Sequence, residues 1–311
     1  MNTKITQNEI IGFNIDFVRF RTSFILPIFN RALNLTNTTN TNIYRENDFV
    51  FTRITSAHSI ASGILALNDT PIINIRVLGD GIAEYSYYGA FFTLGFLSYM
   101  LYDILHYENP RITRLDLALD VRVSVDETVN NNFTLSTPPR VTFTDNKGGT
   151  TTAYIFGQKN SGNKYGFTRI YNKKLDTEKK GKAYLYEHHK NEPIVTRIES
   201  EIRSRYLDEH NTLLSDLTND LYLKNMYLKF NTKKQGKIKI SKKFVENYPL
   251  TRTYRQYESK NDFLLREIIR KIEINNLRNE VLEILTKKYL RYNTIALFIN
   301  AQKNVYFSNW N

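Results

Sequence analysis

Residues 111–123 form the most strongly patterned stretch of this chain. They read Arg-Ile-Thr-Arg-Leu-Asp-Leu-Ala-Leu-Asp-Val-Arg-Val, so apolar and polar side chains alternate. Successive side chains of a β-strand point to opposite faces of a sheet, and this period therefore predicts a strand. One face carries leucines that can enter a core, and the other carries Asp116 and Asp120.

Two later segments alternate in the same way. Residues 167–174 read Phe-Thr-Arg-Ile-Tyr-Asn-Lys-Lys, and residues 194–203 read Ile-Val-Thr-Arg-Ile-Glu-Ser-Glu-Ile-Arg. Each predicts a strand with one polar face. The side chains on these two polar faces are Arg169, Tyr171, Lys173, Arg197, Glu199 and Glu201.

The order of patterned segments predicts an α+β fold with a mostly antiparallel sheet and packed helices. The apolar run at residues 90–105 reads as a buried helix that precedes the first of these strands. We predict three parts: an N-terminal segment with an Asn/Thr-rich linker (residues 1–42), a sheet domain that carries the chemistry (43–206) and a helical, basic C-terminal region (207–311).

Charge and cysteine content narrow the classes of function. The net charge of +12 indicates a polyanionic partner. With no cysteine, the chain cannot form disulfides, thiolate metal sites or cysteine nucleophiles. The apolar run is shorter than the roughly 20 residues of a membrane span, and the first residues lack a secretory signal. We expect a cytoplasmic protein that does not bind membranes.

Tyr171 is the candidate nucleophile. A phenol between the cations Arg169 and Lys173 has a stabilised phenolate, so we expect its pKa to fall below the usual value of about 10. The same cations can hold a phosphate. The residues alone leave an alternative open, in which this face is a solvated sheet surface with cross-strand ion pairs.

Four carboxylates are candidate metal ligands if the three strands are neighbours. Hard oxygen donors suit Mg²⁺ or Mn²⁺, and such an ion could neutralise a scissile phosphate during attack by a tyrosine. The four candidates are Asp116, Asp120, Glu199 and Glu201.

Four blocks in this order resemble the Rep_trans family, the tyrosine-dependent initiators of rolling-circle plasmids, which has relatives in phages. The blocks are Ile112–Asp120, Tyr154–Gly157, Arg169–Lys174 and Arg197–Glu201, within residues 70–205. The resemblance implies a fold related to the TATA-binding protein and a metal-dependent nicking enzyme with Tyr171 as nucleophile. This sequence departs from the family pattern at Ser200, where an apolar residue is usual.

The same resemblance implies a reaction and its partners. The enzyme would nick double-stranded origin DNA at a locally single-stranded site, forming a 5′-phosphotyrosine and leaving a 3′-OH primer, and would rejoin ends later. Family members act as dimers. Because no P-loop is present, a host helicase would have to act with the protein, as would a polymerase.

Basic residues outside the central face are candidate DNA contacts. Two segments, 262–274 and 277–289, read as amphipathic helices with basic polar faces. Each single lysine can equally belong to a solvated face. The predicted DNA-binding residues are Arg197, Lys174, Lys233, Lys234, Lys237, Lys239, Lys242 and Lys243.

Other functions have weaker support in the sequence. A non-catalytic DNA-binding protein with the same sheet is the main alternative, and a tyrosine recombinase is the next. The His-apolar-His motif of the other rolling-circle class is absent. Tyr165, in a Gly-rich segment, is the rival nucleophile by position, but it lacks the basic strand context.

Overall fold

The computed structural model describes residues 5, 9–38, 42–46, 49–54, 59–67, 70–88, 104–105, 107–135, 141–144, 150–155, 164–179, 189, 191–232 and 236–238. Eleven strands within these ranges form one sheet, and each neighbouring pair is antiparallel. In spatial order they are β2 (Ile43–Glu46), β3 (Phe49–Arg53), β4 (Ala61–Leu67), β5 (Thr70–Val77), β6 (Ala83–Tyr88), β1 (Ile10–Thr22), β7 (Ile112–Val121), β12 (Thr196–Arg203), β11 (Gly166–Asn172), β10 (Thr150–Ile155) and β9 (Val141–Thr144).

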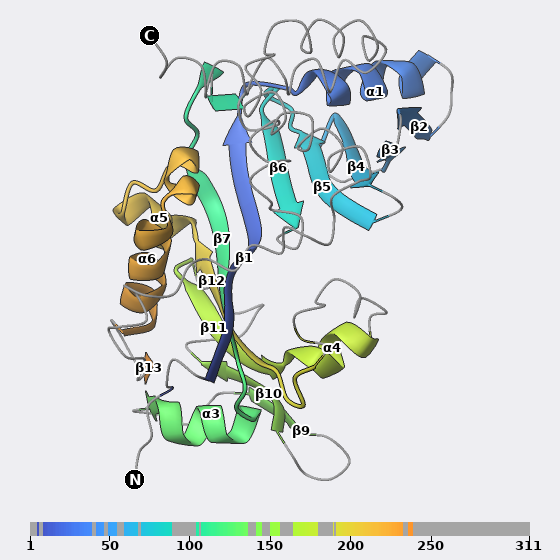
Figure 1. The fold of residues 1–311 in the computed structure, drawn as a ribbon. Coiled ribbons are helices and arrows are strands. Elements are labelled where there is room, and N and C mark those ends of the chain that lie inside the picture. Colours follow the sequence, from blue (N-terminus) through green and yellow to red (C-terminus); the bar gives the residue numbers. More distant parts are fainter. Residues whose placement is uncertain are drawn as a thin grey trace, which may run out of the picture.

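Five α-helices and a small second sheet accompany the large sheet in the described residues (Figure 1). The α+β prediction is confirmed. The second sheet pairs β8 (Phe133–Leu135) with β13 (Gly236–Ile238). The helices are α1 (Pro27–Thr38), α3 (Val125–Asn132), α4 (Lys173–Lys179), α5 (Ser204–Glu209) and α6 (Asp220–Thr232), with a 3₁₀ turn at Leu214–Thr218.

Strand β1 lies in the middle of the sheet, between β6 and β7. The boundary predicted at residue 42 therefore does not separate residues 10–22 from the sheet of residues 43–206. Its pairing with β7 shifts register between Ile10 and Gly12, between Ile15 and Phe17, and between Arg19 and Phe20. A β-bulge adds a residue to one strand and breaks the two-residue period, which explains why no clear period is visible there.

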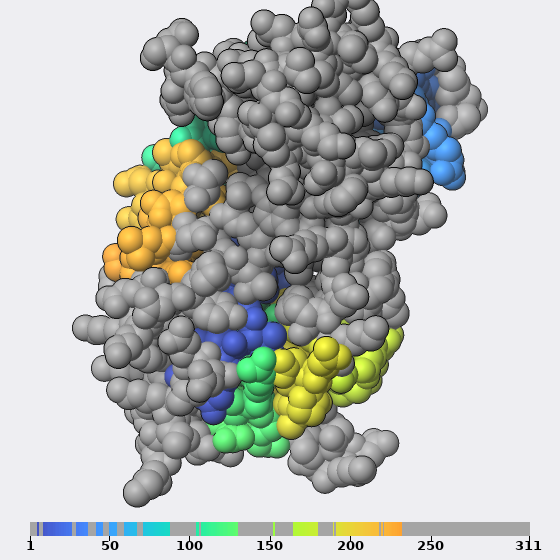
Figure 2. Space-filling view, viewed as in Figure 1, coloured from blue at the N-terminus to red at the C-terminus, as the bar shows by residue number. Residues whose placement is uncertain are grey.

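One face of the sheet is apolar and is covered by helices. Phe29 of α1 packs against Tyr85 of β6, and Tyr227 of α6 packs edge-on against Phe13 of β1. Figure 1 shows α5 and α6 beside β7 and β12, and Figure 2 shows the outer surface of these two helices on the left flank. The leucines of β7 are completely buried, as the alternation predicts.

A buried polar network fixes α6 on this apolar face. The Asn231 amide donates to Ser200 Oγ at 2.8 Å and accepts from Thr168 Oγ1 at 2.8 Å. Asn231 also donates to the carbonyl of Tyr227. Hydrogen-bonded polar groups within a core specify one arrangement of the elements around them, here α6 across β11 and β12.

Several predicted segments differ from the structure or lie outside its described residues. In the predicted helical region from residue 207, a 3₁₀ turn precedes α6, which begins at Asp220. Of the predicted helix at 90–105, only residues 104–105 are described, and they are helical. The predicted helices at 262–274 and 277–289 lie outside the described residues. Within the described part of the chain, every helix is too short or too polar to cross a membrane.

Candidate active site

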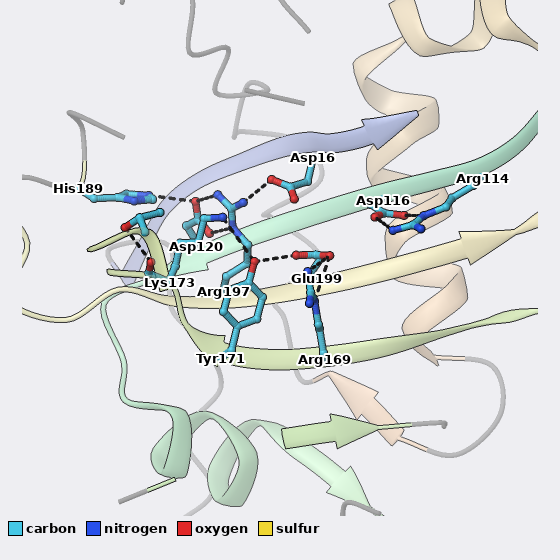
Figure 3. Close-up of polar contacts among 11 residues, drawn as sticks. Asp16, Arg114, Asp116, Asp120, Arg169, Tyr171, Lys173, His189, Arg197 and Glu199 are labelled. Atoms are coloured by element: carbon cyan, nitrogen blue, oxygen red, sulfur yellow. Dashed lines mark hydrogen bonds and ion pairs between the residues drawn. The ribbon is translucent and has the colours of Figure 1, made fainter. Parts of the chain in front are cut away.

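The three alternating strands are direct neighbours, so their polar faces meet. Tyr171 of β11 lies opposite Arg197 of β12, which lies opposite Asp120 of β7. One step along, Arg169 lies opposite Glu199. Figure 3 shows these side chains on one face of the sheet.

The phenol of Tyr171 is held by a carboxylate and flanked by two cations. Its hydroxyl donates to Glu199 Oε2 at 2.7 Å, and Lys173 Nζ donates to it at 3.5 Å. The guanidinium of Arg169 lies 4.8 Å from the ring centroid and also donates to Glu199 Oε1 at 2.7 and 3.1 Å. Only 6% of Tyr171 is exposed.

The pKa of Tyr171 is raised well above its ordinary value, so the prediction of a lowered pKa is wrong. Burial is the largest cause and the negative charge of Glu199 is the next, and they outweigh Arg197 and Arg169. Removing water from a phenolate costs more free energy than partly neutralised cations restore. Tyr171 is therefore a protonated phenol with a carboxylate already placed to accept its proton.

Lys173 is positioned by the junction of a strand and a helix. The Asn172 side chain accepts a hydrogen bond from the Leu175 N–H at 2.9 Å, which caps the first turn of α4. Lys173, the first residue of that turn, is buried although it opens a highly charged segment. Burial and the nearby Arg197 lower the pKa of Lys173.

Arg197 connects the tyrosine to the neighbouring strands. Its Nε and Nη2 donate to the two oxygens of Asp120 at 2.6 and 2.7 Å, and its Nη1 donates to Asp16. Its side chain is 0% exposed. Arg197 was predicted as a DNA contact, but a buried guanidinium bonded to two carboxylates organises the site and has no surface to offer to DNA.

Asp16 and His189 belong to the site although the sequence did not reveal them. Asp16 lies at the register shift between Ile15 and Phe17, and the bulge turns it toward Arg197. His189 lies 3.0 Å from Asp120 Oδ2. Alternating apolar and polar residues around Asp16 could have indicated a strand, but the bulge breaks the period there. No sequence pattern around His189 indicates its role.

The electrostatics of these carboxylates follow from their partners. Burial raises the pKa of Asp120, but Arg197 and His189 outweigh it and the pKa is lowered. The pKa of Asp16 is lowered for a similar reason, with Arg197 and Lys173 opposing the effect of burial. Both groups are therefore anions, and they balance the cations around Tyr171.

Each of the four carboxylates predicted as metal ligands is paired with an arginine, and Asp116 and Glu201 share Arg114. Asp116 is bonded to Arg114 at 2.5 and 2.9 Å. Glu201 also contacts Arg114, at 2.9 Å, and accepts from Arg203 at 2.7 Å. Figure 3 shows the pair of Arg114 and Asp116 farther along the strands than Tyr171. Burial raises the pKa of Asp116 to about 7, which further weakens its case as a ligand.

A divalent ion therefore has few protein donors beside the phenol. No group of three His, Asp or Glu side chains among the described residues has the geometry of a metal site. Mg²⁺ is nevertheless often held by one or two carboxylates together with water and substrate phosphates. Glu199 and Asp16 are the two carboxylates whose charges act on Tyr171.

The lysines predicted to bind DNA are mostly beyond the described ranges. Lys174 donates to the carbonyl of Glu192 at 2.9 Å. Lys237 lies in β13. The other predicted lysines, namely Lys233, Lys234, Lys239, Lys242 and Lys243, lie outside the described residues.

Comparison with solved structures shows a likeness of this chain to a known protein. No family model and no curated protein match this chain. The solved structure of a rolling circle replication initiator protein from Geobacillus stearothermophilus is similar, with 18% sequence identity and a TM-score of 0.40. The match covers 78% of this chain and 93% of that chain. A likeness at this identity and TM-score supports no conclusion about the chemistry of this chain.

Proposed function

We propose that this chain is a replication initiator that nicks one strand of origin DNA through a covalent 5′-phosphotyrosine at Tyr171. The observation that carries the proposal is the 2.7 Å hydrogen bond from the phenol of Tyr171 to Glu199, within a cluster that also holds Arg169 and Lys173. A nucleophile, a proton acceptor and phosphate-binding cations are the groups that transesterification of DNA needs. The order of the four sequence blocks gives independent support.

Glu199 takes the proton of Tyr171 as the phenol oxygen attacks phosphorus. The new bond joins Oη to phosphorus, the bond from phosphorus to the 3′-oxygen breaks, and the 3′-oxygen takes a proton from water. The phosphodiester energy is kept in the tyrosine ester. In the reverse step, a 3′-OH gives its proton to water and attacks phosphorus. The bond between phosphorus and Oη breaks, Glu199 returns its proton to the tyrosine, and the strand is rejoined.

Arg169 and Lys173 bind the nonbridging oxygens of the scissile phosphate. While Glu199 is ionised, it holds Arg169 through two hydrogen bonds. When Glu199 accepts the proton, its charge is lost, and Arg169 becomes available to the phosphate as negative charge develops there. Lys173 is within 3.5 Å of the attacking oxygen and stabilises the same charge.

Mg²⁺ or Mn²⁺ belongs to the proposal as an ion held by Glu199 and Asp16. When bound, it neutralises charge on the scissile phosphate. Origin DNA that is single-stranded around the nick is the proposed substrate. A second copy of the chain, a host helicase and a polymerase are the proposed partners.

Two observations favour a second candidate, a DNA-binding protein without nicking activity. Tyr171 is only 6% exposed, and its pKa is raised. A phosphate reaches the phenol only after the side chains around it move. In the second candidate, the Tyr171–Glu199–Arg169 cluster is a structural ion pair capped by an aromatic ring.

Nicking of supercoiled DNA that carries the cognate origin separates the two candidates. With Mg²⁺ or Mn²⁺, the wild-type chain should produce a nicked circle and a protein–DNA adduct that survives denaturation. Tyr171→Phe should abolish both. Absence of a nick with the wild-type chain would favour the second candidate.

Tyr165 supplies a matched control. Its hydroxyl donates to Glu209 Oε1 at 2.8 Å, and Arg205 lies 4.7 Å from its ring centroid, so it has contacts like those of Tyr171 at a less buried position. Tyr165→Phe should leave the adduct unchanged. An adduct lost in Tyr165→Phe and kept in Tyr171→Phe would move the nucleophile to Tyr165.

A further inference from the structure

Three arginines lie directly opposite one another on neighbouring strands of the polar face. Arg203 of β12 is paired in register with Arg114 of β7, and Arg114 is paired with Arg19 of β1. We call these three residues the arginine row. Like charges directly opposite one another destabilise a sheet unless other groups compensate them.

Arginines also outnumber carboxylates at the neighbouring positions of the same face. The buried carboxylate of Glu84 forms ion pairs with three arginines: Arg21 at 3.0 Å, Arg76 at 3.5 Å and Arg19 at 4.0 Å. Asp116 and Glu201 are the carboxylates that neutralise the other end of the row. In the described part of the chain, five arginines thus contact three carboxylates.

The arginine side chains are partly exposed and are held in position. The side chains of Arg19, Arg21 and Arg76 are 36%, 55% and 35% exposed. Phe17 lies under two members of the row, with Arg114 at 4.5 Å and Arg19 at 5.5 Å from its ring centroid. Burial is the largest cause that lowers the pKa of Arg19; Glu84 opposes it, and the charges of Arg114 and Arg76 add to the lowering.

We propose that the arginine row, extended by Arg21 and Arg76, binds the phosphate backbone of the single DNA strand that leads to Tyr171. Bound phosphates relieve the repulsion between the arginines. Arg203 lies six residues beyond Arg197 on β12, so this contact is about 20 Å from the nucleophile along the face. The link to Tyr171 rests on the proposed function, whereas the binding surface does not.

A single strand fits this surface better than a duplex. The row crosses the sheet in single file and therefore follows one backbone. Guanidinium groups that stack on an aromatic ring can also stack on unpaired bases, which a duplex does not present at its phosphates. The row continues across the same face that carries Tyr171, so one strand can contact both.

Binding of labelled oligonucleotides to the full-length Tyr171→Phe chain tests the proposal without trapping an adduct. The probe is a single-stranded oligonucleotide with the sequence on one side of the nick, and its affinity is measured by fluorescence anisotropy over a salt series. The double change Arg19→Gln and Arg203→Gln should weaken binding about tenfold and reduce the salt slope by about 0.7 per lost phosphate contact. Arg19→Lys with Arg203→Lys should largely restore the slope.

Arg205→Gln is the matched control. Arg205 also contacts a carboxylate and covers a tyrosine ring, but it lies on α5 and not on a strand of the sheet. The Arg205→Gln variant should bind the probe with the same affinity as the parent Tyr171→Phe chain. Arg21→Gln, at the most exposed of the arginines around Glu84, is a second variant that should weaken binding without loss of thermal stability.

The proposal is overturned if the double glutamine variant and Arg21→Gln both bind the single strand as tightly as Arg205→Gln does. It is also overturned if these two variants lose affinity only for the corresponding duplex. Weaker single-strand binding supports it even if the wild-type chain does not nick DNA. A failure of the proposed function and a failure of this surface therefore give different results.

Discussion

The phenol oxygen of Tyr171 lies 2.7 Å from Oε2 of Glu199 on the adjacent strand. Because the pKa of this phenol is raised, chiefly by burial, the proton resides on the tyrosine and must be transferred for the oxygen to attack. The register of two strands thus defines which carboxylate receives the proton. Four predictions follow from this arrangement and from the packing that maintains it.

Glu199→Gln should reduce the rate of adduct formation by about 100-fold or more, the usual contribution of a positioned base. Below its raised pKa, the phenolate fraction of Tyr171 grows about tenfold per pH unit. Without Glu199, the residual rate should therefore rise with pH, and more steeply than in wild type. Single-turnover rates between about pH 6 and 9 measure this difference.

Glu209→Gln, which removes the equivalent partner of Tyr165, is the control and should leave the rate unchanged. If Glu199→Gln reacts at the wild-type rate, Glu199 is not the proton acceptor. If excess Mn²⁺ restores its activity but high pH does not, Glu199 acts as a metal ligand.

Asp120→Asn should lower the free energy of unfolding by about 3 kcal/mol, because it leaves the buried guanidinium of Arg197 with Asp16 alone as an anionic partner. Denaturant titration at about pH 6 measures the loss.

The stability lost in Asp120→Asn should depend on pH. Arg197 and His189 overcome the effect of burial and lower the pKa of Asp120 from the ordinary 3.8. A carboxylate with a lowered pKa contributes stability above its unfolded pKa and loses it as the pH falls toward the folded value. The difference between wild type and Asp120→Asn should therefore shrink below about pH 4. A difference that stays constant to about pH 2 would show that Asp120 does not contribute through its charge.

Asn231→Ala should destabilise the fold by about 2 kcal/mol, since it leaves Thr168 and Ser200 without their amide partner in the core. Leu221→Ala on the same helix is the control, because Leu221 is 55% exposed and should cost little. Equal losses in the two variants would mean that the amide network adds nothing beyond the packing of α6.

The sequence predicted the strands of the site better than it predicted the chemistry between them. Alternation alone placed Tyr171, Glu199 and Asp120 on polar faces, because each of their strands has leucines or isoleucines on the other face. It could not place Asp16, where a bulge breaks the period, or His189, which reaches Asp120 from a separate segment. The pKa of Tyr171 was also beyond reach, since it depends on burial by residues distant in sequence. The pairing of carboxylates with arginines depends on strand register, which single segments do not encode.

Gly166 begins β11, and its backbone conformation affects how Tyr171 is aligned with Glu199. It has φ of +115°, a conformation that side chains rarely adopt, and a Cβ at this position would lie 1.9 Å from the carbonyl oxygen of Glu201. Gly166 is paired with Ile202 at the start of β11. Relief of the clash must therefore shift β11 against β12, the two strands that bring Tyr171 to Glu199.

Gly166→Ala should cost about 2 kcal/mol or more of stability and should lower the nicking rate more than the loss of folded protein explains. Unfolding curves and single-turnover rates on the folded fraction measure the two effects separately. Gly79→Ala is the control, since nothing lies within 4 Å of its added Cβ, and it should change neither. If Gly166→Ala loses stability but nicks normally when folded, the register of β11 tolerates the shift, and the tyrosine–glutamate contact is set by the side chains around it.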